Sequence, residues 1–258
     1  MRAVHGNTRN GTWKKQNKLP HDSTLQVGTV NTNGLSVANK RLAIQDLTLD
    51  VIALTETHLQ SHLHAAYVEQ WKNFNCHFSP DPDSKHYNGV ALLFIKSCFW
   101  KTSTIQWPED SACHKFAAIG RLVAVQAWLG HGGSSIIGYN LYAPSGSRWE
   151  TAKRKQLNEL FDAITEDSIA RGQIPAIVLG DFNMSISECT KLSTSLSNRT
   201  WCDTRNVADA VMYSATTCHV GPSKGSTIDH IFVSPSLFDL IFNFQVKKLA
   251  VFKDQSQV

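Results

Sequence analysis

The sequence has 258 residues, of which 42% are hydrophobic and 18% are charged. This composition supports a folded domain with a full core and excludes a chain that is disordered throughout. The net charge of +4 permits a polyanionic partner without requiring one. No apolar run approaches the roughly 20 residues that a membrane-spanning helix needs, so we expect no membrane partner.

The first twenty residues carry five basic side chains and no acidic one, and they contain no apolar stretch. This pattern excludes a secretory signal peptide. We therefore expect residues 1–24 to form a disordered basic arm, which is either an irregular terminus or a nucleic-acid-binding tail. The simpler interpretation, an irregular terminus, is preferred.

The six cysteines are scattered and form no CxxC pair. This spacing argues against a zinc site. Without a secretion signal, we expect reduced thiols in an intracellular protein.

Apolar runs rich in β-branched residues alternate with helical patterns over the rest of the chain. The order mixes β-α-β units with hairpin connections, which indicates a layered α/β domain with mixed sheets. No linker divides residues 25–258, so we expect a single domain there. Strands are predicted at 25–33, 51–57, 89–96, 120–128, 134–144, 176–180, 226–233 and near 247–252, and helices at 36–50, 150–170 and 203–212.

Polar side chains stand at the ends of several predicted strands. Because side chains alternate along a strand, Asn31 and Asn33 are expected on one face. Each residue alone has an ordinary explanation, such as a turn or a core histidine. Their concentration at strand ends, where layered α/β folds assemble their sites, favours a functional site. The residues are Asn31, Asn33, Glu56, Tyr142, Asp181, Asn183, Ser226, Asp229 and His230.

The segments NTNGL, LTETHL, GVALLF, NLYAP, GDFN and STIDHI follow one another in this order. Together they resemble the endonuclease/exonuclease/phosphatase superfamily, and most closely its LINE-type retrotransposon and apurinic/apyrimidinic endonucleases. The resemblance runs from about residue 25 to the C-terminus. It implies the deoxyribonuclease I-like fold, a four-layered α/β-sandwich with two packed mixed β-sheets. It also implies hydrolysis of phosphodiesters or phosphomonoesters that depends on Mg²⁺, with Mn²⁺ as a substitute.

The resemblance implies that Glu56 binds the metal and that Asn31 and Asn33 support the metal and the phosphate. Mg²⁺ prefers hard oxygen ligands and takes few of them from the protein. One glutamate with neighbouring amides and water therefore suits this ion, which acts as a Lewis acid on the phosphate.

Three further residues are expected to act on the substrate. Asp181 matches the aspartate that orients or activates the attacking water. Tyr142 and Asn183 match neutral donors near the scissile phosphate. Such donors stabilise the charge that develops in the transition state.

The segment STIDHI supplies the remaining implied residues. Asp229 matches a buried catalytic aspartate of the family, and Ser226 is expected to contact backbone phosphate. His230 is predicted to join this phosphate-binding and nucleic-acid-binding group.

The C-terminal segment VFKDQSQV departs from the family pattern, which ends in Ser-Asp-His. Lys253, Asp254 and Gln255 fall on that motif, so Asp254 and Gln255 are the predicted catalytic pair. Glutamine can donate a hydrogen bond to a phosphate, but it carries no charge and shuttles no proton. The domain is then either a truncated remnant that cleaves poorly or a nuclease that works with Gln255. A third alternative is that His219 or His230 is the missing histidine.

Three functions therefore remain open. The first is a Mg²⁺-dependent DNA endonuclease of retrotransposon type, acting in the cell, for example in the nucleus, as a monomer or as part of a polyprotein. The second is a phosphatase or phosphodiesterase that acts on small or lipid phosphoesters. The third is a catalytically inactive module that binds nucleic acid. Salt-sensitive DNA binding supports the first function. Activity on a small phosphoester with none on DNA selects the second, and DNA binding that survives without Mg²⁺ and without nicking selects the third.

Overall fold

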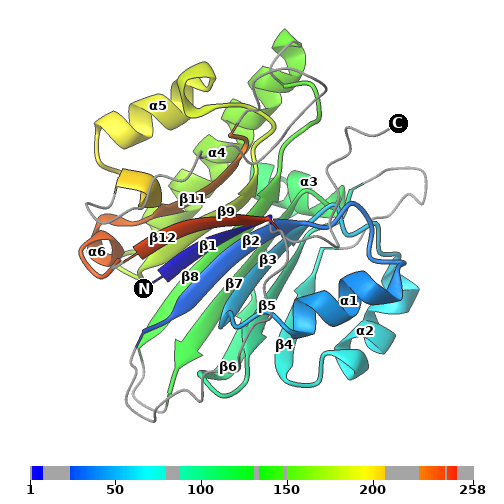
Figure 1. Ribbon diagram of the computed structural model, residues 1–258. Helices are drawn as coiled ribbons and strands as arrows, with labels where there is room; N and C mark the ends of the chain where they lie inside the picture. The colour runs from blue at the N-terminus through cyan, green and yellow to red at the C-terminus, as the bar shows by residue number, and fades with distance from the viewer. Residues whose placement is uncertain are drawn as a thin grey trace.

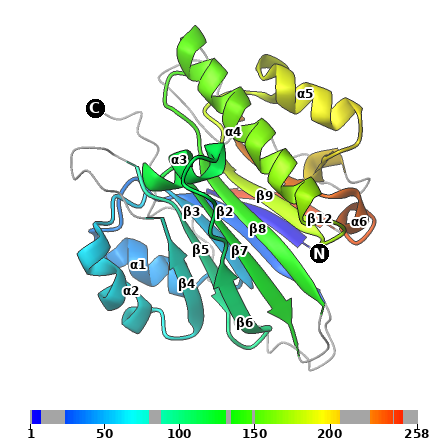
Figure 2. The same ribbon diagram turned by 180° about the vertical axis from the view of Figure 1, so that it is seen from behind.

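A computed structural model describes residues 24–79, 88–130, 134–147, 150–206 and 227–241, together with the backbone of residues 2–7 and 243–248. The described chain forms two six-stranded mixed β-sheets that pack face to face, with helices on both outer faces (Figures 1 and 2). This is the four-layered α/β-sandwich that the sequence predicts.

The first sheet contains β2 and β3, whose carboxyl ends lie at the same edge. These two strands are parallel, and Asn31 pairs with Thr55 at that edge. On the far side of β3, β5 runs antiparallel to both of its neighbours. The strand order is β12 (Asn243–Lys248), β1 (Arg2–Asn7), β2 (Gln26–Asn31), β3 (Val51–Thr55), β5 (Ala91–Ile95) and β4 (Phe74–Phe78).

The prediction of a disordered N-terminal arm is wrong for residues 2–7. This segment forms β1, which pairs in parallel with β2 on one side and with β12 on the other. Its strand conformation depends on neighbours that are distant in sequence, and local composition does not report such pairing. Residues 8–23 of the predicted arm lie outside the described residues.

The second sheet contains β8 and β9, which are parallel and are joined by the long helix α4. Strand β11 runs antiparallel to β9, so its amino end lies beside the carboxyl end of β9. The strand order is β10 (Cys202–Asp203), β11 (Asp229–Val233), β9 (Ala176–Asp181), β8 (Ser135–Tyr142), β7 (Leu122–Leu129) and β6 (Phe99–Thr104).

The helices form the two outer layers of the sandwich. One layer packs on the first sheet and consists of α1 (Ala38–Gln45) and α2 (His64–Gln70). The other packs on the second sheet and consists of α3 (Ala112–Ala118), α4 (Thr151–Ala170) and α5 (Thr190–Ser197). The short helix α6 (Pro235–Phe238) follows β11, and 3₁₀ turns occur at Ser61–Leu63, Ile186–Glu188 and Thr204–Asn206. In the described part of the chain, no helix has the length and apolarity needed to cross a bilayer.

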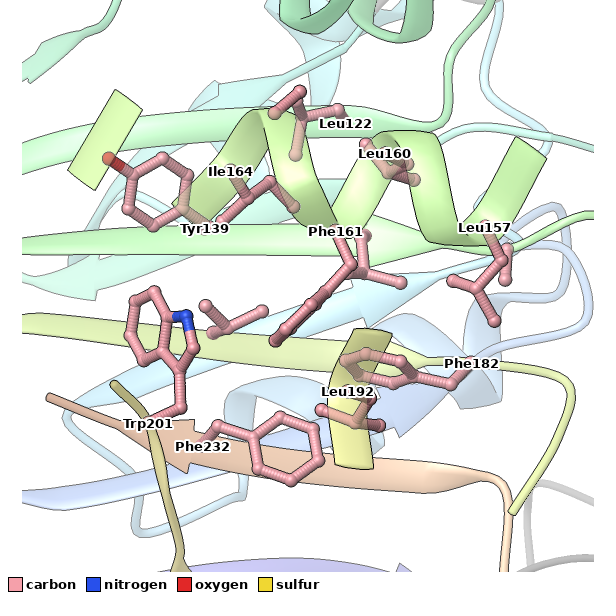
Figure 3. Packing of buried hydrophobic residues seen from close by; sticks show 14 of the residues in the cluster. Leu122, Tyr139, Leu157, Leu160, Phe161, Ile164, Phe182, Leu192, Trp201 and Phe232 are labelled. Atoms are coloured by element: carbon pink, nitrogen blue, oxygen red, sulfur yellow. The ribbon is translucent and has the colours of Figure 1, made fainter. Parts of the chain in front are cut away.

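Helix α4 is held to the second sheet by a continuous apolar face. Its buried residues follow the spacing of one helical face, and Figure 3 shows them packed against side chains from the sheet. Each fully buried side chain of this size contributes roughly 1.5–3 kcal/mol. The helix residues are Leu157, Leu160, Phe161 and Ile164, and their neighbours include Tyr139, Phe182, Trp201 and Phe232.

Two polar side chains join the facing sheets. Asn140, fully buried in β8, donates through Nδ2 to the carbonyl oxygens of Leu54 and Ala91, at 2.8 and 2.9 Å. A second link joins an edge strand of each sheet: the ring nitrogens of His77 in β4 lie 2.7 and 2.8 Å from hydroxyl groups of β6. Burial lowers the pKa of His77 to about 4. These contacts hold the two sheets in a defined relative position.

The His77 link predicts that acid destabilises the fold. The usual pKa of histidine, 6.5, applies in the unfolded chain, whereas the folded value is about 4. Between these values the unfolded chain binds more protons, so stability present above pH 6.5 is lost as the pH falls towards 4. Urea unfolding at pH 7, 5.5 and 4 should show a smaller loss in His77→Gln than in the parent. Burial also lowers the pKa of His230, but both proteins contain this residue and its contribution cancels in the comparison. Equal losses of stability in the two proteins would therefore contradict the prediction.

Candidate active site

Five strand ends from both sheets meet at one edge of the sandwich. Asn31 ends β2, and Glu56 directly follows β3. Tyr142 ends β8, Asp181 ends β9, and Asp229 begins β11. The structure thus brings together five of the residues that the sequence analysis selected.

The side chain of Asn31 bridges carboxylates that belong to different sheets. Its Nδ2 donates to Glu56 Oε1 at 2.9 Å and to Asp181 Oδ2 at 3.1 Å. Its Oδ1 accepts the backbone N–H of Asn33 at 3.0 Å. Because the oxygen is turned towards the backbone, the amide presents its donors to both carboxylates. In this arrangement Asn31 separates and orients the two acidic groups.

Asp181 lies in an environment that disfavours its negative charge. Its side chain is buried, and Asp229 is its partner on the antiparallel strand β11. Burial, then Asp229, then Glu56 raise the pKa of Asp181 well above its usual value. Hydrogen bonds from the Asn183 backbone N–H, at 2.8 Å, and from Asn31 oppose this shift. Asp181 is therefore tuned towards accepting a proton.

Glu56 is held in a backbone conformation that is unusual for a glutamate. Its φ is 51°, in the left-handed region, which stores roughly 1–3 kcal/mol of strain. Its carbonyl oxygen accepts bonds from Gly34 N, at 2.7 Å, and from Thr32 Oγ1, at 2.8 Å. His58 Nε2 lies 4.0 Å from Glu56 Oε2. The turn after β2 therefore fixes the backbone of Glu56.

Tyr142 presents a protonated hydroxyl beside the carboxylates. Its oxygen lies 2.8 Å from Ser145 Oγ. Burial, then Glu56 and Asp181 raise the pKa of Tyr142 above its usual value. The guanidinium of Arg121 lies 5.1 Å from the ring centroid, and its Nη1 donates to the Tyr142 carbonyl oxygen at 3.2 Å. A cation over the ring restrains its orientation.

Asn183 connects the ends of β8 and β9. Its backbone N–H donates to Asp181, and its Nδ2 donates to the Ala143 carbonyl oxygen at 2.9 Å. Its φ of 50° places it in the left-handed region. The side-chain NH₂ of Asn183 has two hydrogens, so it can donate a second hydrogen bond in addition to the one to Ala143.

The predicted placement of Asn33 is wrong. Strand β2 ends at Asn31, and Asn33 lies in the following turn with a φ of 42°. The alternation that would place both asparagines on one face therefore does not extend to residue 33. Asn33 is exposed, and its backbone N–H supports Asn31. A metal-supporting role of its side chain stays a prediction.

The prediction that His230 binds phosphate or replaces the missing histidine is also wrong. His230 is 1% exposed and stacks on Phe232 with ring centroids 5.5 Å apart. Its Nε2 lies 3.3 Å from the Met184 carbonyl oxygen, and burial lowers its pKa to about 3. Because side chains alternate along β11, His230 faces the core while Asp229 faces the site.

Ser226, Asp254, Gln255 and His219 lie outside the described residues, so their predicted roles stay predictions. Sequence reasoning missed the positions of Arg121 and Lys40. Arg121 follows a glycine at the start of a strand, and Lys40 follows the NTNGL turn. The sequence shows these two positions next to a strand and a turn, but it does not show which groups the two side chains contact.

The acidic groups of the site have the chemistry of a magnesium-binding set. In the described residues, no group of three or more His, Cys, Asp or Glu side chains has metal-site geometry. Mg²⁺ commonly takes only one or two protein carboxylates, however. The repulsion from Glu56 and Asp229 that raises the pKa of Asp181 is relieved by a cation. The hard oxygens of Glu56 therefore fit Mg²⁺.

Two packed mixed sheets with flanking helices define the deoxyribonuclease I-like fold. The model of the endonuclease/exonuclease/phosphatase family matches residues 28–240. The chain belongs to this family, whose members are hydrolytic nucleases and phosphatases. A comparison of the sequence with curated proteins gives no significant match.

Several solved structures share the fold at low sequence identity. The catalytic domain of Xenopus laevis APE2 is 17% identical over 83% of both chains, with a TM-score of 0.64. The 3′ phosphatase NExo from Neisseria, bound to product DNA hairpin, is 20% identical over 83% of this chain and 88% of that one, with a TM-score of 0.58. The Bacteroides thetaiotaomicron mannosyl-6-phosphatase Bt3783 is 17% identical over 83% and 86%, also with a TM-score of 0.58. At these identities the likeness establishes the fold alone.

A glycine precedes Asp181 because β8 and β9 approach closely at that point. Gly180 has a φ of 138°, and a Cβ there would overlap the carbonyl oxygen of Leu141 in β8. This backbone region is almost restricted to glycine. Gly138 in β8 differs, because a Cβ there would meet Phe94 Cζ at 3.4 Å and Leu92 Cδ1 at 3.5 Å.

Gly180→Ala is expected to lower the free energy of unfolding by more than the roughly 1–3 kcal/mol of backbone strain, because the overlap must also be relieved. The matched change Gly138→Ala should have the smaller effect. Urea unfolding monitored by tryptophan fluorescence measures both. Equal stabilities of the two variants would contradict the close approach at Gly180.

Proposed function

We propose that the protein is a Mg²⁺-dependent phosphodiesterase that acts on DNA, an endonuclease related to the retrotransposon and apurinic/apyrimidinic types. The observation that carries the proposal is the Asn31 amide between the carboxylates of Glu56 and Asp181. Buried carboxylates cost folding energy unless they are paired. Their presence at the meeting point of both sheets supports a catalytic purpose.

Asp181 is proposed to accept the proton of the attacking water. A general base works best when its pKa approaches the working pH, and the raised pKa of Asp181 moves it in that direction. The bonds from Asn31 and Asn183 orient both oxygens of the carboxylate. Asp229 assists by disfavouring the negative charge of Asp181.

Tyr142 and Asn183 are proposed to donate hydrogen bonds to the phosphate oxygens. The raised pKa of Tyr142 keeps its hydroxyl protonated at neutral and mildly basic pH. Neutral donors that are already oriented stabilise the more negative transition state without binding the substrate more tightly. Arg121 contributes by restraining the ring of Tyr142.

Glu56 is the proposed metal ligand, with Asp181 beside it, and Mn²⁺ is the natural substitute for Mg²⁺. When bound, such an ion acts as a Lewis acid on the phosphate and offsets developing charge. Asn31 holds the two carboxylates apart in a fixed relation.

DNA is favoured as the substrate by three observations. The chain carries a net charge of +4, its NTNGL and LTETHL segments resemble retrotransposon endonucleases, and a fold relative is described as bound to product DNA. Action on a small phosphoester is the second candidate, because the fold is shared with a mannosyl-6-phosphatase. The endonuclease would act inside the cell, for example in the nucleus, as a monomer or as part of a polyprotein.

Gln255 is proposed to stand where the family has its catalytic histidine. A glutamine in this position would donate a hydrogen bond to the phosphate without transferring a proton. Loss of one acid–base group typically lowers a rate by about 10²–10⁴-fold. A weak but measurable nuclease is the expected result.

The first test is nicking of supercoiled plasmid in Mg²⁺ by the parent, Asp181→Ala and Gln255→His. We expect slow nicking by the parent, none by Asp181→Ala and faster nicking by Gln255→His. The reason is that Asp181 supplies the base and the histidine restores the missing proton donor. Chelation of Mg²⁺ with EDTA should stop all nicking.

The alternatives give different results in the same assay. DNA binding without nicking in all three proteins would identify an inactive binding module. Hydrolysis of mannose 6-phosphate by the parent without nicking would select the small-phosphoester function. Binding that is independent of salt would count against phosphate contacts.

Tyr142→Phe is expected to lower kcat by about 10²-fold, because a transition-state donor is lost. The matched control is Tyr139→Phe, three positions earlier in the chain and therefore on the opposite face of β8. The Tyr139 hydroxyl donates to Asp167 at 2.7 Å, on the side of the sheet that α4 covers. Steady-state kinetics should show normal kcat for the control. Equal kcat values in the two variants would remove Tyr142 from the mechanism.

A further inference from the structure

Two adjacent basic residues of α1 donate to five consecutive backbone carbonyls of the turn that follows β2. Lys40 Nζ bonds the first three carbonyl oxygens, and Arg41 Nη1 bonds the next two. The distances are 2.6 Å to Thr32, 2.7 Å to Asn33 and 3.1 Å to Gly34 for Lys40, and 3.0 Å to Leu35 and 2.7 Å to Ser36 for Arg41.

The first three residues of this turn also hold the active site. The N–H of Asn33 donates to Asn31 Oδ1, which directs the amide donors of Asn31 towards both carboxylates. Thr32 Oγ1 and the N–H of Gly34 both donate to the carbonyl oxygen of Glu56. The conformation of three turn residues therefore determines the positions of Asn31 and Glu56.

The turn needs a partner for its carbonyls. Asn33 and Gly34 have φ values of 42° and 81°, outside the strand and helix regions, and the backbone bonds from Thr32 and Gly34 to the end of β3 and the residue after it use their N–H groups, not their carbonyl oxygens. Backbone carbonyls that lack a partner cost free energy, and an ammonium group with three donors can satisfy three of them. Lys40 is half-buried, and its charge also interacts with Glu56.

We propose that Lys40 is a positioning residue of the active site, which holds residues 32–34 in the conformation that aims Asn31 at Glu56 and Asp181. A basic pair beside a DNA-cleaving site would ordinarily be assigned to phosphate binding. Here all three donors of the Lys40 ammonium are engaged within the protein. The catalytic consequence rests on the proposed function, whereas the ordering of the turn does not.

Lys40→Met keeps the aliphatic stem and removes the donors. We expect kcat to fall by about 10²-fold, as small displacements of positioned groups do, while KM for DNA and the salt dependence stay unchanged. Loss of a phosphate contact would instead reduce the salt slope by about one. Lys40→Arg should regain part of kcat. The control is Lys155→Met on α4, whose parent side chain is 78% exposed, and it should match the parent.

Hydrogen exchange followed by mass spectrometry provides a readout that does not need activity. Amides of residues 31–36 should exchange faster in Lys40→Met than in the parent, with no change in Lys155→Met. If the parent hydrolyses neither DNA nor a small phosphoester, the proposed function fails and exchange alone decides the role of Lys40. Unchanged exchange in Lys40→Met, or a changed KM and salt slope, would overturn the proposal.

Discussion

The candidate active site depends on one amide that joins acidic groups from two separate sheets. Asn31 belongs to the first sheet and Asp181 to the second. Buried carboxylates repel each other strongly in a medium of low polarity, so their separation must be set by the sheets that carry them. Asn140 and His77 join the sheets at other points and keep that separation constant. The packing of the two sheets against each other therefore determines the geometry of the site.

Strain is concentrated at the same edge. Asn33, Glu56, His58 and Asn183 all have left-handed backbone conformations there. Each costs free energy that the local hydrogen bonds must offset. The bonds from the turn after β2 to Glu56 and from Asn183 to the end of β8 do so. A rigid, strained rim is suited to groups that must meet a substrate in one geometry, because such groups need little rearrangement during the reaction.

A fold of this kind does not by itself define a substrate. The sandwich brings the polar strand ends of the candidate site together, and proteins that share this fold include a phosphatase bound to DNA and a mannosyl-6-phosphatase. Specificity in such folds is assigned by the site and its loops, not by the layers. The net charge of +4 is a property of the whole chain and bears on association with nucleic acid, not on chemistry.

The sequence by itself determined most strands and the residues at their ends, because β-branched runs and the polar residues after them are local patterns. Glu56 and Asp181 could be selected in this way. Only the tertiary structure decided that β1 pairs within the first sheet, that His230 faces the aromatic core, and that Lys40 bonds carbonyls of a turn. The physical reason is that these outcomes depend on which partners the rest of the fold brings within hydrogen-bonding or packing distance. A pattern of neighbouring residues does not contain that information.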